Sequence, residues 1–123
     1  MLIFKSKYIP SPDFVEVNSI EDIKKTKPSD IVLLKEFKAP FDLAKYCKEN
    51  KVAYAIEANS ILDALYASAL EASYAIAEIN LAKQLQKIAD NYLWDMKILA
   101  KIANEEELEE VALNGIDGAI LEA

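Results

Sequence analysis

Five charged residues recur along the chain at nearly constant spacing, each at the end of a short apolar segment: Glu36, Glu57, Glu78, Lys101 and Glu122. The intervals between them are 21, 21, 23 and 21 residues. Carboxylates close to an ammonium group can exchange protons with a substrate, bind a hard cation such as Mg²⁺, or hold an anion. The functional interpretation of this row is therefore a carboxylate–lysine cleft.

In this interpretation Glu57 and Glu78 act as acid/base groups or metal ligands, and Lys101 stabilises an anion. The candidate residues are Glu57, Glu78, Lys101 and Glu122 as catalytic groups, and Asn59 and Asn80 as groups that bind substrate. The simpler interpretation is that each charge ends a buried strand at the surface, and that each asparagine caps a helix. No catalytic motif accompanies the row, which favours the simpler interpretation.

The composition removes much of the usual catalytic chemistry. The chain contains no histidine and no arginine, and it has one cysteine and two glycines. These counts exclude a histidine-based triad, a thiolate zinc site and a guanidinium clamp for phosphate. Phosphate-binding loops need several glycines, so we expect no nucleotide or flavin cofactor. Cys47 lacks a histidine base and is interpreted as a small buried hydrophobic residue.

Length and charge define the broad class of protein. The chain has 123 residues, a typical size for one domain, with an irregular portion over 1–30 and a regular one over 31–123. The net charge of −7 argues against nucleic-acid and anionic-membrane partners. No stretch approaches the roughly 18 apolar residues that span a bilayer, and no signal peptide is evident. We therefore expect a cytoplasmic protein.

A repeat of about 21 residues fits one short strand, one helix and two short loops. The apolar segments predict strands over Ile31–Glu36, Val52–Glu57, Ser73–Glu78, Lys97–Lys101 and Gly118–Glu122, with weaker ones over Leu2–Phe4 and Phe14–Val17. Near-continuous apolar strands that alternate with helices indicate a parallel sheet. The fold class is therefore α/β, with repeated βα units and a mainly parallel sheet of five to seven strands. Both a doubly wound sheet and a partial (βα) barrel fit this pattern.

Five helices are expected between these strands. The first begins at Ser19 and runs to about Thr26, and the second covers Phe41–Lys48 after Pro40. The remaining starts are assigned to Asn59 or Ser60 for Ile61–Leu70, to Asn80 for Leu81–Tyr92, and to Asn104 for the last helix.

The segment Asn104–Glu122 contains Gly115-Ile-Asp-Gly-Ala-Ile-Leu after a helical stretch. This segment resembles a helix–strand unit of aldolase-type (βα)8 barrels. The resemblance covers about one sixth of the chain. It implies a parallel strand at the end of the chain and transfers no catalytic residue.

Two functions follow from these observations. The first is a non-catalytic interaction or self-assembly domain, because Ile61–Leu70 is apolar around most of its circumference and no helix follows the last strand. It implies a homo-oligomer or a protein partner. The alternative is a small-molecule-binding protein or an enzyme that uses the carboxylate–lysine cleft, with or without Mg²⁺. This alternative requires Glu57, Glu78 and Lys101 to lie together in a concave pocket.

Overall fold

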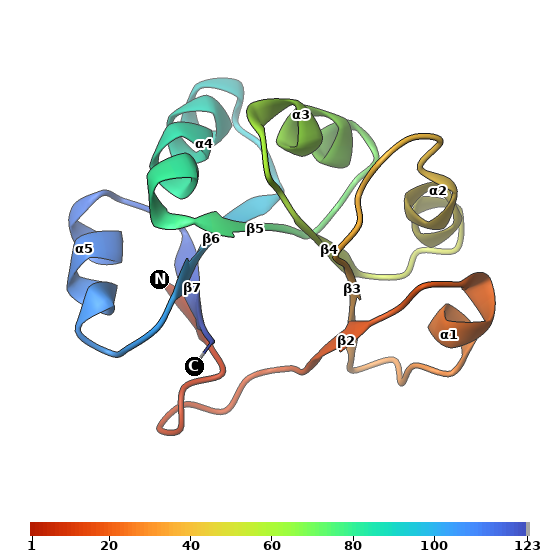
Figure 1. Ribbon diagram of the computed structural model, residues 1–123, viewed down its shortest axis with the longest axis horizontal. Helices are drawn as coiled ribbons and strands as arrows, with labels where there is room; N and C mark the ends of the chain where they lie inside the picture. Colours follow the sequence, from red (N-terminus) through yellow and green to blue (C-terminus); the bar gives the residue numbers. More distant parts are fainter. Residues whose placement is uncertain (123) are drawn as a thin grey trace.

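The computed structural model describes residues 1–122, which form seven strands and five helices (Figure 1). The strands are β1 (Leu2–Phe4), β2 (Phe14–Glu16), β3 (Ile31–Leu34), β4 (Tyr54–Glu57), β5 (Tyr74–Glu78), β6 (Lys97–Ile102) and β7 (Gly118–Leu121). The helices are α1 (Ile20–Lys24), α2 (Asp42–Glu49), α3 (Ile61–Ala69), α4 (Ile79–Tyr92) and α5 (Glu107–Leu113). Within residues 1–122, no helix combines the length and the apolar character needed to cross a bilayer.

All seven strands are parallel and lie in the order β1-β7-β6-β5-β4-β3-β2. From β2 to β7 each strand pairs with the next along the chain, and β1 returns to pair with β7. The sheet is curled, and the helices lie around its outside (Figure 1). This arrangement is a partial (βα) barrel and confirms that alternative. The doubly wound alternative is wrong, because it needs a reversal of strand order and helices on both faces.

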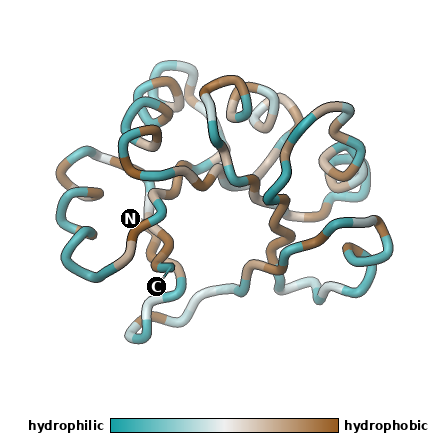
Figure 2. The backbone as a smooth tube through the Cα atoms, in the orientation of Figure 1, coloured by the Kyte–Doolittle hydropathy of each residue, from teal (hydrophilic) through white to brown (hydrophobic). Residues whose placement is uncertain are grey.

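The inner face of the sheet packs against itself. Every second residue of the strands contributes to an apolar interior that consists of Phe4, Ile31, Leu33, Ala55, Ile76, Leu99 and Ile120. The rings of Phe4 on β1 and Phe14 on β2 lie 5.0 Å apart, and Tyr74 lies 5.3 Å from Phe4. Figure 2 shows the strands that surround this interior as mostly hydrophobic. Because the sheet is curled, the side chains of its own strands cover the inner face. A flatter partial barrel would leave this face exposed to a partner.

The outer face of the sheet packs against the helices. Cys47 of α2 and Tyr54 of β4 are fully buried in this layer, and the Tyr54 hydroxyl donates to the Leu70 carbonyl at 2.8 Å. Burial raises the pKa of the Cys47 thiol to about 11. A thiol with such a pKa stays protonated and unreactive at neutral pH, as a small buried hydrophobic residue does.

The helix starts settle one sequence-based alternative, Asn59 or Ser60, and correct one assignment, Asn80. Ser60 accepts a hydrogen bond from the Asp63 amide at 3.2 Å and so caps α3. Helix α4 begins directly after β5, so Glu78 is its N-cap in place of Asn80. The reason is that no loop separates the two elements, and a carboxylate reaches the free amides of the first turn as well as an amide oxygen does.

Candidate functional site: a polar cleft at the carboxyl ends of the strands

The charged residues at the strand ends follow the residues of the apolar interior along each strand. Side chains on one face of a strand recur every two residues. Glu57 follows the interior residue Ala55 by two positions, and Lys101 follows Leu99 in the same way. Ile76 and Glu78 show the same spacing, as do Ile120 and Glu122. Since all strands are parallel, these charges gather at the carboxyl end of the curled sheet, where α/β proteins place their ligands.

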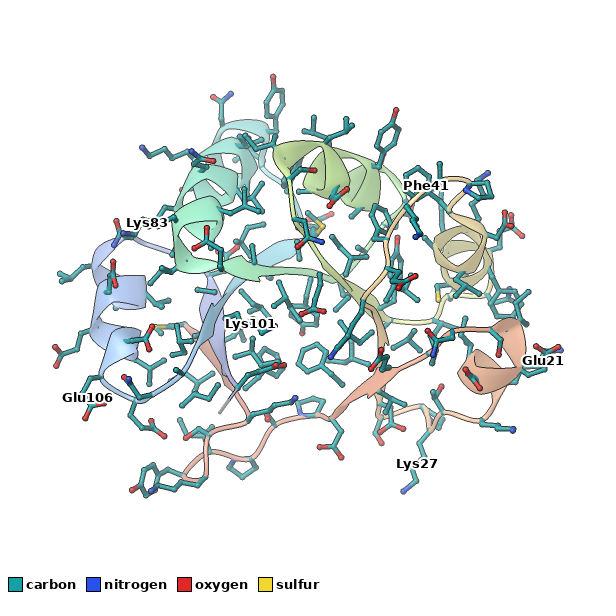
Figure 3. The ribbon with its side chains drawn as sticks, viewed as in Figure 1. Glu21, Lys27, Phe41, Lys83, Lys101 and Glu106 are labelled. Carbon is teal, nitrogen blue, oxygen red and sulfur yellow. The ribbon has the colours of Figure 1, made fainter. Side chains whose placement is uncertain are left out.

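Lys101 is the centre of an ion-pair network at this end of the sheet. Its Nζ donates to Glu57 Oε1 at 3.0 Å and lies 3.8 Å from Glu122 Oε2. Lys5, just after β1, pairs with Glu122 Oε1 at 3.4 Å. Figure 3 shows Lys101 beside the interior of the curled sheet. The network thus links the ends of β4, β6, β7 and β1.

The hydrogen bond to Glu57 raises the pKa of the Lys101 ammonium, and the charges of Glu57 and Glu122 raise it further. Burial opposes this effect, because it disfavours the charged form. The outcome is a lysine that remains protonated at neutral pH and is held between two carboxylates.

Glu78 does not join the network. Its carboxylate accepts hydrogen bonds from the backbone amides of Asn80 at 2.9 Å and Leu81 at 2.7 Å, in the first turn of α4. A negative charge at this position also complements the helix dipole. The end of β5 therefore lacks a charge directed at Lys101, and a hollow remains between Lys101 and α4.

This hollow is a cleft of about 450 Å³, within the size range of small-molecule sites. It is lined by Glu57, Ala58, Asn59, Ile76, Ala77, Glu78, Asn80, Leu81, Gln84 and Lys101. The apolar residues come from the strand ends, whereas carboxylates, amides and the ammonium form the polar part of the lining. Such a surface can contact the carbon skeleton of a ligand and hydrogen-bond its polar groups.

The structure brings five of the six predicted site residues to one place. Glu57, Asn59, Glu78, Asn80 and Lys101 all line the cleft. Glu122 is connected to it only through its contact with Lys101. The expected proximity of Glu57, Glu78 and Lys101 in a concave pocket is thus confirmed, whereas their chemical roles remain predictions.

Sequence reasoning missed three charged residues near the strand ends and misplaced one. Lys5 belongs to the network, and Lys35 pairs with Glu16 at 3.8 Å across β2 and β3. Glu36 does not end a strand, because β3 ends at Leu34, and its carboxylate lies 3.7 Å from Lys38. The available signal was the pattern of an apolar residue, any residue and a charge, which occurs at Phe14–Glu16 and Leu33–Lys35.

Glu57 and Glu78, the expected metal ligands, already accept hydrogen bonds from other groups of the protein. Glu57 bonds Lys101, and both oxygens of Glu78 accept backbone amides. Over residues 1–122, no group of three or more potential metal-binding side chains comes together. Glu57 and Glu78 would have to leave these partners to bind Mg²⁺, so the metal-ligand role remains a prediction.

Fold and site together define a class: an α/β protein built as a partial parallel barrel, with a polar cleft at the carboxyl ends of its strands. No protein-family model matches the chain, and comparison with curated proteins found no match.

Proposed function

We propose that this protein binds a small polar molecule in the cleft and does not transform it chemically. The observation that carries this proposal is the convergence of Glu57, Lys101 and three amide side chains around one open hollow of about 450 Å³. These groups come from β4, β6 and α4 and from the segment before α3, so the fold holds them in place from several sides.

The state of Lys101 supports binding over catalysis. A lysine that forms a covalent adduct with a carbonyl must be deprotonated, which requires a lowered pKa. The pKa of Lys101 is raised instead, by its contacts with Glu57 and Glu122. The chain also has no histidine to act as a general base near neutral pH. Both features support electrostatic binding of a ligand over its chemical conversion.

The test is a screen of small polar fragments by NMR, using the backbone amide shifts of the wild-type protein. Ligands that perturb Ala58, Asn59, Asn80 and Leu81 together would support the proposal. Lys101→Met should change the affinity of these ligands, because it removes the central ammonium group and leaves Glu57 without its partner. Lys83→Met is the matched control, since Lys83 pairs with Glu110 at 2.8 Å on the outside of the barrel (Figure 3). Shifts scattered over the surface, or equal effects of the two variants, would refute it.

A second candidate function, self-association, is favoured by an exposed apolar stripe on α3. Ile61, Leu62, Leu65 and Tyr66 are exposed by 39%, 59%, 43% and 48%. They lie on one side of the helix, while Ala64 and Ala67 face the sheet. Exposed apolar patches on a soluble chain often mark protein contacts. Here we propose a second copy of this chain as the partner.

Light scattering after size exclusion, from low to high micromolar concentration, tests this second candidate. The wild type should form a dimer, and the double variant Leu62→Glu/Leu65→Glu should stay monomeric because two charges cannot be buried unpaired. Leu113→Glu is the control, since Leu113 lies on α5, outside the α3 stripe, and is 88% exposed. A wild type that is monomeric throughout the range would rule out self-association.

A further inference from the structure

We infer that the ligand of the cleft carries a primary ammonium group beside hydroxyl or amide groups, and that the cleft disfavours phosphorylated molecules. This inference rests on the proposed function and specifies the class of ligand. Three features of the cleft carry it: the N-terminus of α4, the charges of the lining, and the shared position of Lys101.

The N-terminus of α4 is the place where a phosphate group would be expected to bind. The free amides and the dipole of a helix start attract anions. Here the carboxylate of Glu78 already accepts the amides of Asn80 and Leu81 at 2.9 and 2.7 Å. A ligand phosphate would have to displace this internal carboxylate and remain close to its negative charge.

The charges of the residues that line the cleft also disfavour a phosphorylated ligand. Two carboxylates, Glu57 and Glu78, and one ammonium, Lys101, line the cleft, which leaves one net negative charge. The Lys101 charge is compensated by Glu57 and by Glu122, which lies just outside the lining. The chain has no arginine that could bind phosphate through two parallel hydrogen bonds. An anionic ligand would thus find no free cation in the cleft, whereas a cationic ligand finds carboxylates.

Lys101 provides a way to free one of these carboxylates. Its Nζ lies 3.0 Å from Glu57 and 3.8 Å from Glu122, and its side chain is 41% exposed. In the proposed complex Lys101 turns from Glu57 to Glu122, whose Oε2 already lies 3.8 Å from Nζ. The ammonium of the ligand then replaces Nζ at Glu57, whose side chain is only 20% exposed and so is held in place. The amides of Asn59, Asn80 and Gln84 remain available for the other polar groups of the ligand.

The experiment compares matched probes that differ in one group. Glucose, glucosamine and glucose 6-phosphate form one set, and 1,4-butanediol, 4-aminobutanol and 4-hydroxybutyl phosphate form another. NMR titration follows the amides of Ala58, Asn59, Asn80 and Leu81. The ammonium probe of each set should bind roughly tenfold more tightly than the neutral one, because a hydrogen bond between two charged groups is stronger than one to a neutral group. The phosphorylated probe should bind most weakly.

Glu57→Gln keeps the size of the side chain and removes its charge, so it should abolish the preference for the ammonium probe. Glu110→Gln, which breaks the Lys83 pair outside the cleft, should leave the preference unchanged. If neutral or phosphorylated probes bind at the cleft as tightly as ammonium probes, the ligand class is wrong and the binding function stands. If no probe of either set perturbs the cleft amides, the ligand class is also refuted. The wider fragment screen then decides on the binding function alone.

Discussion

Glu78 shows how neighbouring residues decide what one carboxylate does. Glu57 and Glu78 occupy equivalent positions, each two residues after an interior residue of its strand. Glu57 is followed by a short loop and turns to Lys101. Glu78 is followed at once by α4, so the nearest unsatisfied groups are the amides of that helix. The same residue type therefore forms an ion pair in one repeat and a helix cap in the next.

This difference predicts the outcome of two alanine substitutions. Glu78→Ala should lower the free energy of unfolding by about 1 kcal/mol, the usual effect of losing an N-cap. Asn80→Ala should change it by less than about 0.5 kcal/mol, as is typical of surface positions without special contacts. Denaturant titration of both variants measures the two values. A larger loss for Asn80→Ala than for Glu78→Ala would contradict the assignment of Glu78 as the cap.

Among the structural elements, β1 is held in place by contacts with the other end of the chain. It has only three residues and pairs with β7, where Leu2 lies opposite Gly118. The Leu2 amide also donates to the Asp117 carbonyl at 2.9 Å. A Cβ atom at Gly118 would lie 2.5 Å from the Leu2 carbonyl oxygen and 2.9 Å from Leu99 Cδ2. The close approach of β1 to β7 therefore requires glycine at this position.

We expect Gly118→Ala to push β1 away from β7 and to lower the free energy of unfolding by about 1–3 kcal/mol, as overpacking does. Hydrogen exchange at Ile3 and Phe4 should become faster. Gly115→Ala is the comparison: Gly115 has φ of +64°, and a methyl group added there would meet no atom within 4 Å. The free energy of unfolding of that variant should fall by about 1 kcal/mol through backbone strain. Once this global loss is taken into account, hydrogen exchange in β1 should be unchanged. Unchanged exchange in β1 of Gly118→Ala would refute the role of the close approach.

At the scale of the whole molecule, side chains bridge the two edge strands of the curled sheet. β1 and β2 are the two outer strands of the sheet order and are joined by the segment 5–13 (Figure 1). Between them, Phe4 and Phe14 are in edge-to-face contact with ring centroids 5.0 Å apart. Tyr74 from β5 contacts both rings, at 5.3 and 6.0 Å. Aromatic packing thus holds together the two edges of the curled sheet.

Loss of this packing should therefore loosen both edges at once. Phe14→Leu removes the ring contacts and should lower the free energy of unfolding by about 1 kcal/mol, the contribution of aromatic geometry beyond buried area. Amide exchange should rise in β1 as well as in β2. Phe37→Leu, which alters the Phe37–Phe41 pair outside the sheet, is the control and should affect only α2 and its loop. Faster exchange confined to β2 in Phe14→Leu would contradict closure by side chains.

The local pattern of the sequence was sufficient for the elements and for the position of the site. All seven strands were predicted, with ends shifted by at most two residues, because each is a short apolar run between turn or helix signals. The spacing of Glu57, Glu78 and Lys101 placed them at the carboxyl ends of parallel strands, and the structure puts all three on one cleft. These features depend on residues close together in the chain.

Tertiary structure alone decided the closure of the sheet and the partners of the charges. The sequence allowed both a doubly wound sheet and a partial barrel, because strand order depends on pairings between remote segments. Lys5 and Glu122 lie 117 positions apart, and the Phe4–Phe14 contact depends on the accumulated curvature of all seven strands. Of the five evenly spaced charges that first suggested a site, Glu57, Lys101 and Glu122 form the ion-pair network, whereas Glu36 and Glu78 lie outside it. The hollow between Lys101 and Glu78 is the cleft.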